Sequence, residues 1–312
     1  MVMSCFRSAI DSKQFIITAE ISPPKGSDTT EMLAKAQLLR GRVHAINLTD
    51  SSRAVLGMSP VVSAFLIQQH TGIEAICQLA CRDRNRIALQ GDLLGAYRLG
   101  IRNILALTGD PIGVGDHPKA RAVFDLEAVR LLQIIQKLNR GHDSLDRPLP
   151  QGGTDLWAGA AVDPQSPSWV GLQGRVERKV KAGAKFFQSQ MITDFDRLDK
   201  FMHTIARPLG IKVLAGIFLL KSAKNAQFIN KYVPGVQIPD ALIDRLAQAN
   251  VPLQTGMEIA AEQINMARQL CDGVHIMAVK AEHLIPAILD RSGLGHINDD
   301  PLPQAQAVQS AL

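Results

Sequence analysis

Short apolar runs alternate with longer amphipathic segments along almost the whole chain. The short runs have the length and the residue types of buried strands, and the segments between them carry apolar residues at three- and four-residue intervals, as helices do. This alternation predicts βα units around a parallel sheet. The eight predicted strands are Phe15–Ile21, Val43–Leu48, Ala75–Leu79, Asn103–Leu107, Ala158–Val162, Lys185–Gln190, Lys212–Ile217 and Gly273–Ala278.

Residues that begin and end helices flank several amphipathic segments, of which 31–39 and 87–99 are examples. Small polar or acidic residues accept hydrogen bonds from the first turn of a helix, and glycine adopts the left-handed conformation that often ends one. The predicted starts are Asp28 with Glu31, Ser59 with Pro60, and Asp194, and the predicted ends are Gly100, Gly183 and Gly210.

Three stretches depart from the simple βα rhythm. The segment 141–153 is rich in Gly and Pro, so we interpret it as an exposed insertion before the fifth strand. The seventh connection is long enough for two helices, Pro239–Ala249 and Thr255–Leu270, instead of one. The tail after residue 292 is polar and is expected to be loose. None of these stretches resembles a linker, so we expect one domain over residues 1–312.

An open, doubly wound sheet shares the same alternation as a closed barrel. Such a sheet would be favoured by a G-x-G-x-x-G turn after the first strand. The chain has Ser22-Pro23-Pro24-Lys25-Gly26 there instead. The predicted fold is therefore an α/β single-domain (β/α)8 TIM barrel.

Composition narrows the partners and the cellular setting. Hydrophobic residues make up 46% of the chain and aromatic residues 4%, which predicts an aliphatic core. The net charge of +5 comes from dispersed basic residues, which favours anionic small molecules over nucleic acid. No apolar run reaches the roughly 18 residues of a membrane span, so we expect no membrane insertion. The four cysteines are scattered, which is typical of a reduced, cytoplasmic protein, and Cys77 and Cys81 are interpreted as core residues.

Glu20 is the most suggestive polar residue at a strand end. Reactive groups of (β/α)8 barrels lie where strands end at the carboxyl face, because the following loops build the pocket there. A carboxyl group in an apolar strand is desolvated, and it then holds its proton to higher pH, as a general acid must. The alternative is that Glu20 lies on the outer strand face and pairs with Lys or Arg.

The second and fourth strands also end in polar residues. Thr49 and Asp50 follow one strand, and Thr108-Gly109-Asp110 follow the other, so both bring hydroxyls, amides and a carboxylate to the same rim. Each group is equally consistent with an ordinary turn or helix cap. Arg82 and Arg84 after the third strand are candidates for anion binding or for pairing with Asp83 and Asp92.

Gln188 and Gln190 lie on one face of the sixth strand, because side chains alternate along a strand. Two amides that point into a barrel are unfavourable unless they bind something. The alternative is that they face the helices and bond to backbone.

These motifs occur together in an order that resembles the methylenetetrahydrofolate reductase family. The resemblance runs from about residue 10 to residue 292, and it is nearest to the short bacterial reductases of one-carbon and acetogenic pathways. The residues that carry it are Glu20 with Pro23-Pro24-Lys25, Thr49, Leu107-Thr108-Gly109-Asp110, Arg178-Lys179, Ser189-Gln190 and Gly216-Ile217.

The resemblance implies a flavin-bearing barrel that reduces 5,10-methylenetetrahydrofolate to 5-methyltetrahydrofolate, a step of one-carbon metabolism and methionine biosynthesis. The hydride comes from the reduced flavin. Glu20 would be the general acid, Asp110 would act beside flavin and folate, and Gln190 would orient the pterin. The residues implied for the flavin are Thr49, Gln78, Gly109, Asp110 and Gln188, with Arg178 and Lys179 on its phosphates.

Three departures from the family pattern bear on the cofactor and the electron donor. Gln78 stands where the family has His, and residues 163–167 replace a Tyr-Pro-Glu-x-His loop, so FAD is expected with FMN as the alternative. Residues 221–224 lack the family's aromatic ring. The electron donor is thus NADH, NADPH or a partner redox subunit, within a homo- or hetero-oligomer.

Two other functions remain open at this point. One is a folate- or pterin-dependent methyltransferase-type barrel without flavin, which the absence of yellow colour would reveal. The other is an electron-relay or scaffold subunit with a decayed site, against which the intact Glu20, Asp110 and Gln190 argue.

Overall fold

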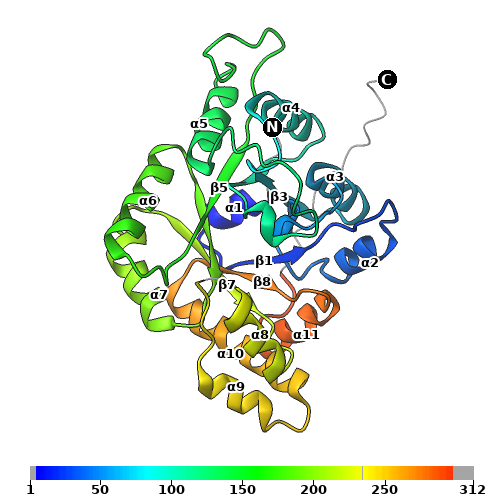
Figure 1. Cartoon of the computed structure of the whole chain (residues 1–312), viewed down its shortest axis with the longest axis vertical. Coiled ribbons are helices and arrows are strands. Elements are labelled where there is room, and N and C mark those ends of the chain that lie inside the picture. The colour runs from blue at the N-terminus through cyan, green and yellow to red at the C-terminus, as the bar shows by residue number, and fades with distance from the viewer. Residues whose placement is uncertain (1–4, 234, 298–312) are drawn as a thin grey trace.

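The computed structural model describes residues 5–233 and 235–297. Its eight parallel strands form one closed barrel in sequence order, with helices around the outside (Figure 1). The predicted (β/α)8 fold is therefore confirmed, and no predicted strand end is more than two residues from its position in the structure. The strands are β1 (Ile16–Ile21), β2 (Ala45–Leu48), β3 (Glu74–Ala80), β4 (Asn103–Leu107), β5 (Trp157–Val162), β6 (Phe186–Met191), β7 (Lys212–Phe218) and β8 (Gly273–Met277).

The helices pack on the outer face of the barrel through a continuous aliphatic layer. The α-helices are α1 (Cys5–Asp11), α2 (Thr30–Leu38), α3 (Pro60–Thr71), α4 (Arg86–Arg98), α5 (Ala128–Asn139), α6 (Trp169–Lys181), α7 (Phe195–Phe201), α8 (Ala223–Tyr232), α9 (Asp240–Ala247), α10 (Pro252–Leu270) and α11 (Ile285–Arg291). Four short helices complete the described chain, namely η1 (Ser52–Ala54), η2 (Ile112–Val114), the π-helical η3 (Met202–Ala206) and η4 (Glu282–Leu284).

The predicted helix ends have the expected local chemistry. Asp28 Oδ1 accepts a hydrogen bond from the Thr30 amide at 2.9 Å, and Asp194 Oδ1 accepts one from the Arg197 amide at 2.9 Å. Gly183 has φ +104°, which L-residues other than glycine rarely adopt. Gly100 and Gly210 likewise have positive φ. Helix α3 begins at Pro60, directly after Ser59, but the Ser59 side chain makes no capping hydrogen bond.

The connection between β7 and β8 differs from the prediction, because it contains three helices instead of two. Both predicted helices exist as α9 and α10, and α8 was missed. Ser222 caps α8 by accepting a hydrogen bond from the Asn225 amide at 3.1 Å. The buried face of α8 is only Ala226 and Ile229, too short a pattern to stand out in the sequence. Figure 1 shows α8 and α9 as an extra layer beside α10.

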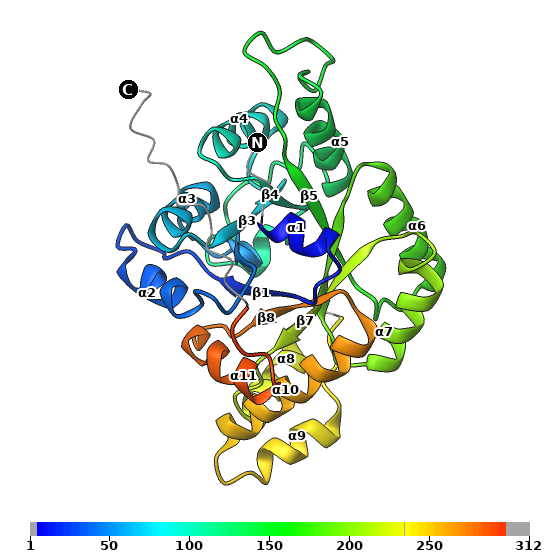
Figure 2. The same cartoon turned by 180° about the vertical axis from the view of Figure 1, so that it is seen from behind.

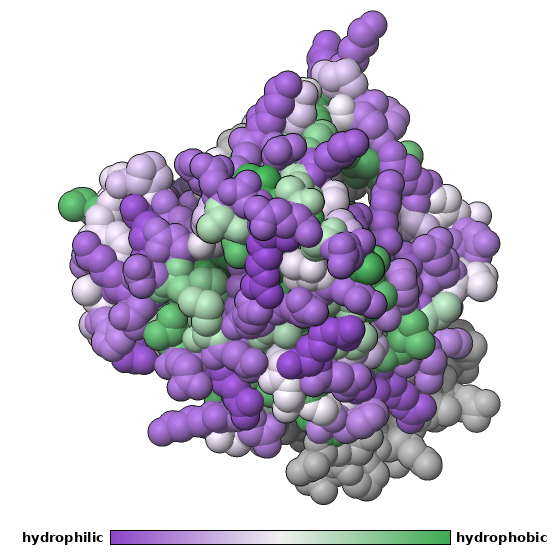
Figure 3. Space-filling view, turned by 90° about the horizontal axis from the view of Figure 1, so that it is seen from below, coloured by the Kyte–Doolittle hydropathy of each residue, from purple (hydrophilic) through white to green (hydrophobic). Residues whose placement is uncertain are grey.

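The surface matches a chain with dispersed charge. Figure 3 shows the side on which α9 lies in Figure 1, where hydrophilic residues predominate and hydrophobic ones form small groups. Residues 141–153 protrude between α5 and β5 (Figure 1). Of the predicted loose tail, residues 298–312 lie outside the described residues. None of the helices that the structure describes is long and apolar enough to cross a membrane.

An aromatic cluster closes the amino end of the barrel. Helix α1 lies across this end (Figure 2), and its Phe6 meets the rings of Trp157 and Phe186 edge-on, with centroids 5.5 and 5.4 Å apart. A Cβ at Gly159 would lie 2.4 Å from the Phe186 ring, so glycine makes room for this ring inside the barrel. The barrel floor is therefore solid and apolar.

Above this floor the barrel interior becomes polar. Side chains alternate along each strand, so the positions two residues beyond the floor residues face inward again. They form a ring of buried polar groups below the carboxyl end. The members of this inner polar layer are Thr18, Asn47, Gln78, Gln188 and His275, each at most 7% exposed.

We expect Phe186→Ala to lower the free energy of unfolding by about 3–5 kcal/mol, because it removes a buried ring and leaves a cavity in the barrel floor. The matched control is Phe228→Ala, since Phe228 is 49% exposed. Urea unfolding followed by circular dichroism measures both. Equal losses in the two variants would contradict the role of the floor.

Candidate functional site

Glu20 lies on the inner face of β1, at the carboxyl end of the barrel. Its side chain is 17% exposed, and its Oε2 lies 3.5 Å from Nε2 of His275 on β8. This placement excludes the alternative in which Glu20 faces outward and pairs with Lys or Arg. The carboxyl group is thus held at the boundary between the inner polar layer and the mouth.

His275 is a member of the site that the sequence did not single out. Its side chain is completely buried, and its Nδ1 lies 3.1 Å from Thr18 Oγ1 and 3.3 Å from Asn47 Nδ2. Its Nε2 has no hydrogen-bond partner among the described residues. The available signal was the strand alternation, which places His275 on the inner face of β8.

Of the two amides predicted on the inner face of β6, Gln188 faces the barrel interior, whereas the register of β6 with β7 shifts between Gln188 and Met191, next to Gln190. Gln188 shares the inner face with the floor residue Phe186 and is 7% exposed, and its Oε1 is a buried atom without a hydrogen-bond partner in the part of the chain described. Gln190 is two residues nearer the mouth and is exposed. Gln78 on β3 and Thr49, directly after β2, are also buried. The barrel interior therefore offers buried amide groups on β3 and β6.

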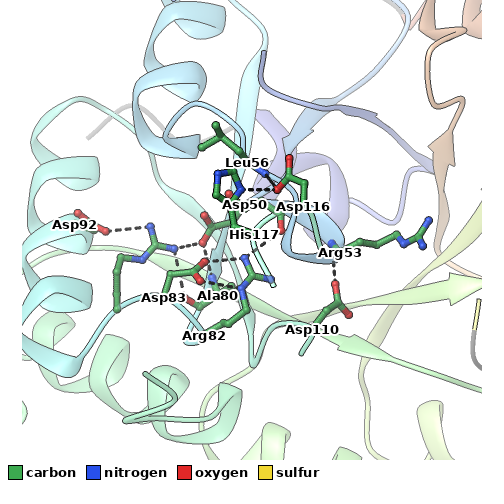
Figure 4. A network of polar contacts seen from close by, with 12 residues as sticks. Asp50, Arg53, Leu56, Ala80, Arg82, Asp83, Asp92, Asp110, Asp116 and His117 are labelled. Atoms are coloured by element: carbon green, nitrogen blue, oxygen red, sulfur yellow. Dashed lines mark hydrogen bonds and ion pairs between the residues drawn. The ribbon is translucent and has the colours of Figure 1, made fainter. Parts of the chain in front are cut away.

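The arginines after β3 pair with acidic residues, which was the second of their two predicted roles (Figure 4). Arg82 Nη2 lies 2.7 Å from Asp83 Oδ2, and Arg84 forms an ion pair with the buried Asp50. Burial raises the pKa of Asp50, and the charge of Arg84 opposes this rise. Asp50 also accepts a hydrogen bond from the Ala80 amide at 2.7 Å, so it joins the ends of β2 and β3.

The polar residues after β4 serve different purposes. Thr108 Oγ1 accepts a hydrogen bond from the Ala128 amide at 3.2 Å and so caps α5. Gly109 has φ +96°, and a Cβ there would lie 2.9 Å from Arg82 Cβ, which explains the glycine without a ligand. Asp110 is exposed at the rim, and its Oδ2 accepts a hydrogen bond from the Arg53 amide at 2.9 Å.

The loop between β2 and α3 is held in an unfavourable backbone conformation. Ser51, Arg53 and Ala54 have φ of +46°, +55° and +55°, which is uncommon outside glycine. Arg82 Nη2 donates to the Ser51 carbonyl at 3.0 Å, and Asp110 holds the Arg53 amide. In Figure 4 the Arg53 side chain points away from Asp110. The loop thus depends on contacts from the segments that follow β3 and β4.

Asp116 joins three loops of the rim. Its carboxylate accepts hydrogen bonds from Lys25 Nζ at 2.7 Å and from the Leu56 amide at 3.0 Å, and it lies 2.9 Å from His117 Nδ1. These contacts, with that of Lys25 the largest, hold the pKa of Asp116 well below its usual range. The loops after β1, β2 and β4 are therefore connected on one side of the mouth.

The predicted basic pair on α6 does not act as one unit in the structure. Lys179 Nζ donates to the Ala161 carbonyl on β5 at 2.7 Å, whereas Arg178 is exposed on the helix. Burial lowers the pKa of Lys179. Two further cations reach the loop after β5, because Arg175 and Arg197 both hydrogen-bond to Ser166, at 2.8 and 2.6 Å.

The cysteines have the features of core residues. Cys77 and Cys81 are fully buried, and burial raises the pKa of Cys81 to about 12 and that of Cys77 further. No cluster of three or more His, Cys, Asp or Glu side chains suited to a metal ion occurs in residues 5–233 and 235–297.

A closed barrel with a carboxyl, an imidazole and several amides gathered at the carboxyl ends of its strands has the layout of a (β/α)8 enzyme. The sequence specifies the class further, since a sequence model described as Methylenetetrahydrofolate reductase matches residues 5–293. The chain belongs to this family.

The chain is similar to full-length relatives at modest identity. It is 25% identical over 292 residues to Methylenetetrahydrofolate reductase 2 of Schizosaccharomyces pombe, covering 88% of this chain and 45% of that protein. It is 23% identical over 312 residues to a probable methylenetetrahydrofolate reductase (NADPH) of Caenorhabditis elegans, covering 93% of this chain and 44% of that protein. The chain therefore spans less than half the length of these two relatives.

A solved structure supports the fold independently. An uncharacterized protein from Clostridium thermocellum, which binds two copies of 5-methyl-5,6,7,8-tetrahydrofolic acid, superposes with a TM-score of 0.61. Its sequence is 14% identical, and the match covers 92% of this chain and 99% of that one.

We expect Asp116→Ala to speed hydrogen exchange of the Leu56 amide and of residues 51–58, because the loops after β1 and β2 lose their common anchor. The pKa of Asp116 is lower in the folded protein than in the unfolded chain, where it is about 3.9. The ion pair of Asp116 therefore stabilises the fold above pH of about 3.9, and this contribution is lost as the pH falls from there through the folded-state pKa. Exchange mass spectrometry at neutral pH and acid unfolding measure both effects. The control is Asp196→Ala at an exposed position of α7, and identical behaviour of the two variants would contradict the role of Asp116.

Proposed function

We propose that this protein reduces 5,10-methylenetetrahydrofolate to 5-methyltetrahydrofolate with hydride from a reduced flavin, and that Glu20 is the general acid. The observation that carries the proposal is the inward position of Glu20 at the barrel mouth, 17% exposed and in reach of a buried imidazole. In a chain of this family, a proton donor at that position suits the opening of a folate ring. We place this activity in cytoplasmic one-carbon metabolism leading to methionine.

A folate substrate agrees with the chemistry of the mouth. The pterin ring is edged with hydrogen-bond donors and acceptors, and the rim offers the exposed groups of Gln190 and Asp110. The Clostridium thermocellum protein that shares the fold binds a reduced methylfolate. We propose that Gln190 orients the pterin and that Asp110 lies beside it.

A flavin fits the polar groups below the mouth. Gln188 Oε1 is buried and unpaired within the described chain, and Gln78 lies at the same depth on β3. We propose that these amides, with Thr49 and the loop of Gly109 and Asp110, contact the flavin ring. When bound, the flavin supplies the hydride.

The flavin phosphates require cations at the rim. Lys179 uses one of its three N–H groups on the Ala161 carbonyl, which leaves two for an anion. We propose that Lys179 meets the phosphates and that the exposed Arg178 adds a second charge. FAD is the expected form, with FMN as the alternative.

The residues divide the chemistry between proton transfer and charge stabilisation. Glu20 gives its proton from a carboxyl oxygen to a folate nitrogen, which opens the five-membered ring to an iminium ion on the substrate. The carboxylate of Asp110 stabilises this positive charge. Methyltetrahydrofolate leaves once the iminium carbon has accepted the hydride.

We expect Glu20→Gln to keep the flavin bound and reducible by dithionite, while reoxidation by methylenetetrahydrofolate slows by about 10²–10⁴-fold because the proton donor is lost. Anaerobic stopped-flow absorbance measures the rate, and the visible spectrum measures flavin content. Glu31→Gln, at an exposed position on α2, is the matched control. Normal reoxidation in Glu20→Gln would remove Glu20 from the mechanism, and a colourless native protein would favour the methyltransferase-type alternative.

We expect Asp110→Asn to slow the same reoxidation by about 10²-fold, because a neutral amide no longer stabilises the cation. An asparagine oxygen still accepts the Arg53 amide, so the rim loop should keep its conformation. Titration with NADH, NADPH and dithionite on the same samples identifies the electron donor or shows that a partner subunit is required. An unchanged reoxidation rate would exclude the charge of Asp110 from the reaction.

A further inference from the structure

We propose that His275 is a positioning residue that holds the Glu20 carboxyl group in both of its protonation states. This inference deepens the proposed function and rests on the role of Glu20 in it. The two side chains come from β8 and β1, and Glu20 Oε2 lies 3.5 Å from His275 Nε2. No sequence motif pointed to this pair.

The buried nitrogen of His275 is aimed at Glu20 and at no other hydrogen-bonding group of the described chain. The imidazole is 0% exposed, and its Nε2 is without a hydrogen bond. Leaving a buried polar group unpaired is unfavourable. A small movement of the Glu20 side chain, which is at the mouth, would close the gap to a hydrogen bond.

The other ring nitrogen of His275 has partners for either tautomer. When Nδ1 accepts from Asn47 Nδ2, at 3.3 Å, the proton sits on Nε2 and can be donated to a Glu20 carboxylate. When Nδ1 carries the proton, it can donate to Thr18 Oγ1, at 3.1 Å, and Nε2 then accepts from a protonated Glu20. The Thr18 hydroxyl can support this second state because it donates in turn to the Val274 carbonyl, at 3.3 Å.

Strand pairing fixes this arrangement rigidly. Thr18 is paired in register with His275, and Glu20 is paired with Asn47, so all four residues belong to three adjacent strands of the barrel. On the other side of β8, His275 is in register with Gly216, which brings no side chain against the imidazole. A general acid held by strands, instead of by a loop, keeps its orientation during turnover.

The kinetic test compares three variants of buried histidines. We expect His275→Phe to slow reoxidation of the reduced flavin by methylenetetrahydrofolate by about 10- to 100-fold, mainly in the limiting rate, because the acid loses its orientation. His275→Gln keeps a polar group that reaches towards Glu20, so it should recover part of this loss. His44→Phe is the control, since His44 is also buried but bonds to the Ile17 amide at 3.0 Å. A normal rate in His275→Phe would overturn the proposal.

A second measurement detects the contact between His275 and Glu20 by nuclear magnetic resonance, without folate turnover. In protein labelled with ¹⁵N-histidine, His275→Gln assigns the His275 ring signals by their disappearance. Glu20→Gln should then shift the His275 nitrogens and leave those of His44 unchanged. Unchanged His275 signals would overturn the proposal.

The two measurements separate this inference from the proposed function. If the native flavoprotein fails to react with methylenetetrahydrofolate while Glu20→Gln still shifts the His275 signals, the proposed function is wrong and the pairing of the two residues stands. The opposite case is normal native turnover with no slowing of reoxidation in His275→Phe and no shift of the His275 signals in Glu20→Gln. The positioning role is then wrong, and the reductase assignment is unaffected.

Discussion

Everything at the candidate site depends on the change from an apolar floor to a polar layer inside one closed barrel. Polar groups removed from water are unfavourable unless they are paired, so a ring of buried amides and an imidazole is tolerated only where the surrounding strands pair most of its atoms. Two atoms of this layer that lack a hydrogen bond in the described chain are Gln188 Oε1 and His275 Nε2. We propose that a ligand and the Glu20 carboxyl group, respectively, are their partners. The aliphatic layer and the aromatic floor supply the stability that such an interior lacks.

The rim adds a second constraint, because the loops above β1 to β4 are tied to one another and to the end of β3. Asp50, Arg82 and Asp116 each bond to backbone groups of another segment. They hold a loop whose backbone is strained at three residues. Since Asp110 is one of the groups that hold this loop, the position of the proposed charge and the shape of the mouth are coupled.

The sequence predicted the architecture well, because strand and helix periodicities are local properties. It did not decide which face of β1 carries Glu20, since alternation defines two faces and only barrel closure tells them apart. Asp50 follows β2 and Arg84 follows β3, so their pairing depends on these two strands lying side by side, which the sequence does not show. The positive φ of Ser51, Arg53 and Ala54 depends on partners distant in sequence. None of the three is glycine, so the residue types gave no sign of this conformation. His275 acquires its meaning only through the register of β8 with β1.

Helix α1 closes the amino end of the barrel, so it determines from which end a ligand can reach the interior. Phe6 packs on Trp157 and Phe186, and these rings close the amino end of the barrel. Whatever reaches the buried amides enters and departs on the same side. Two ligands that need the same space at the carboxyl end could therefore bind only one after the other.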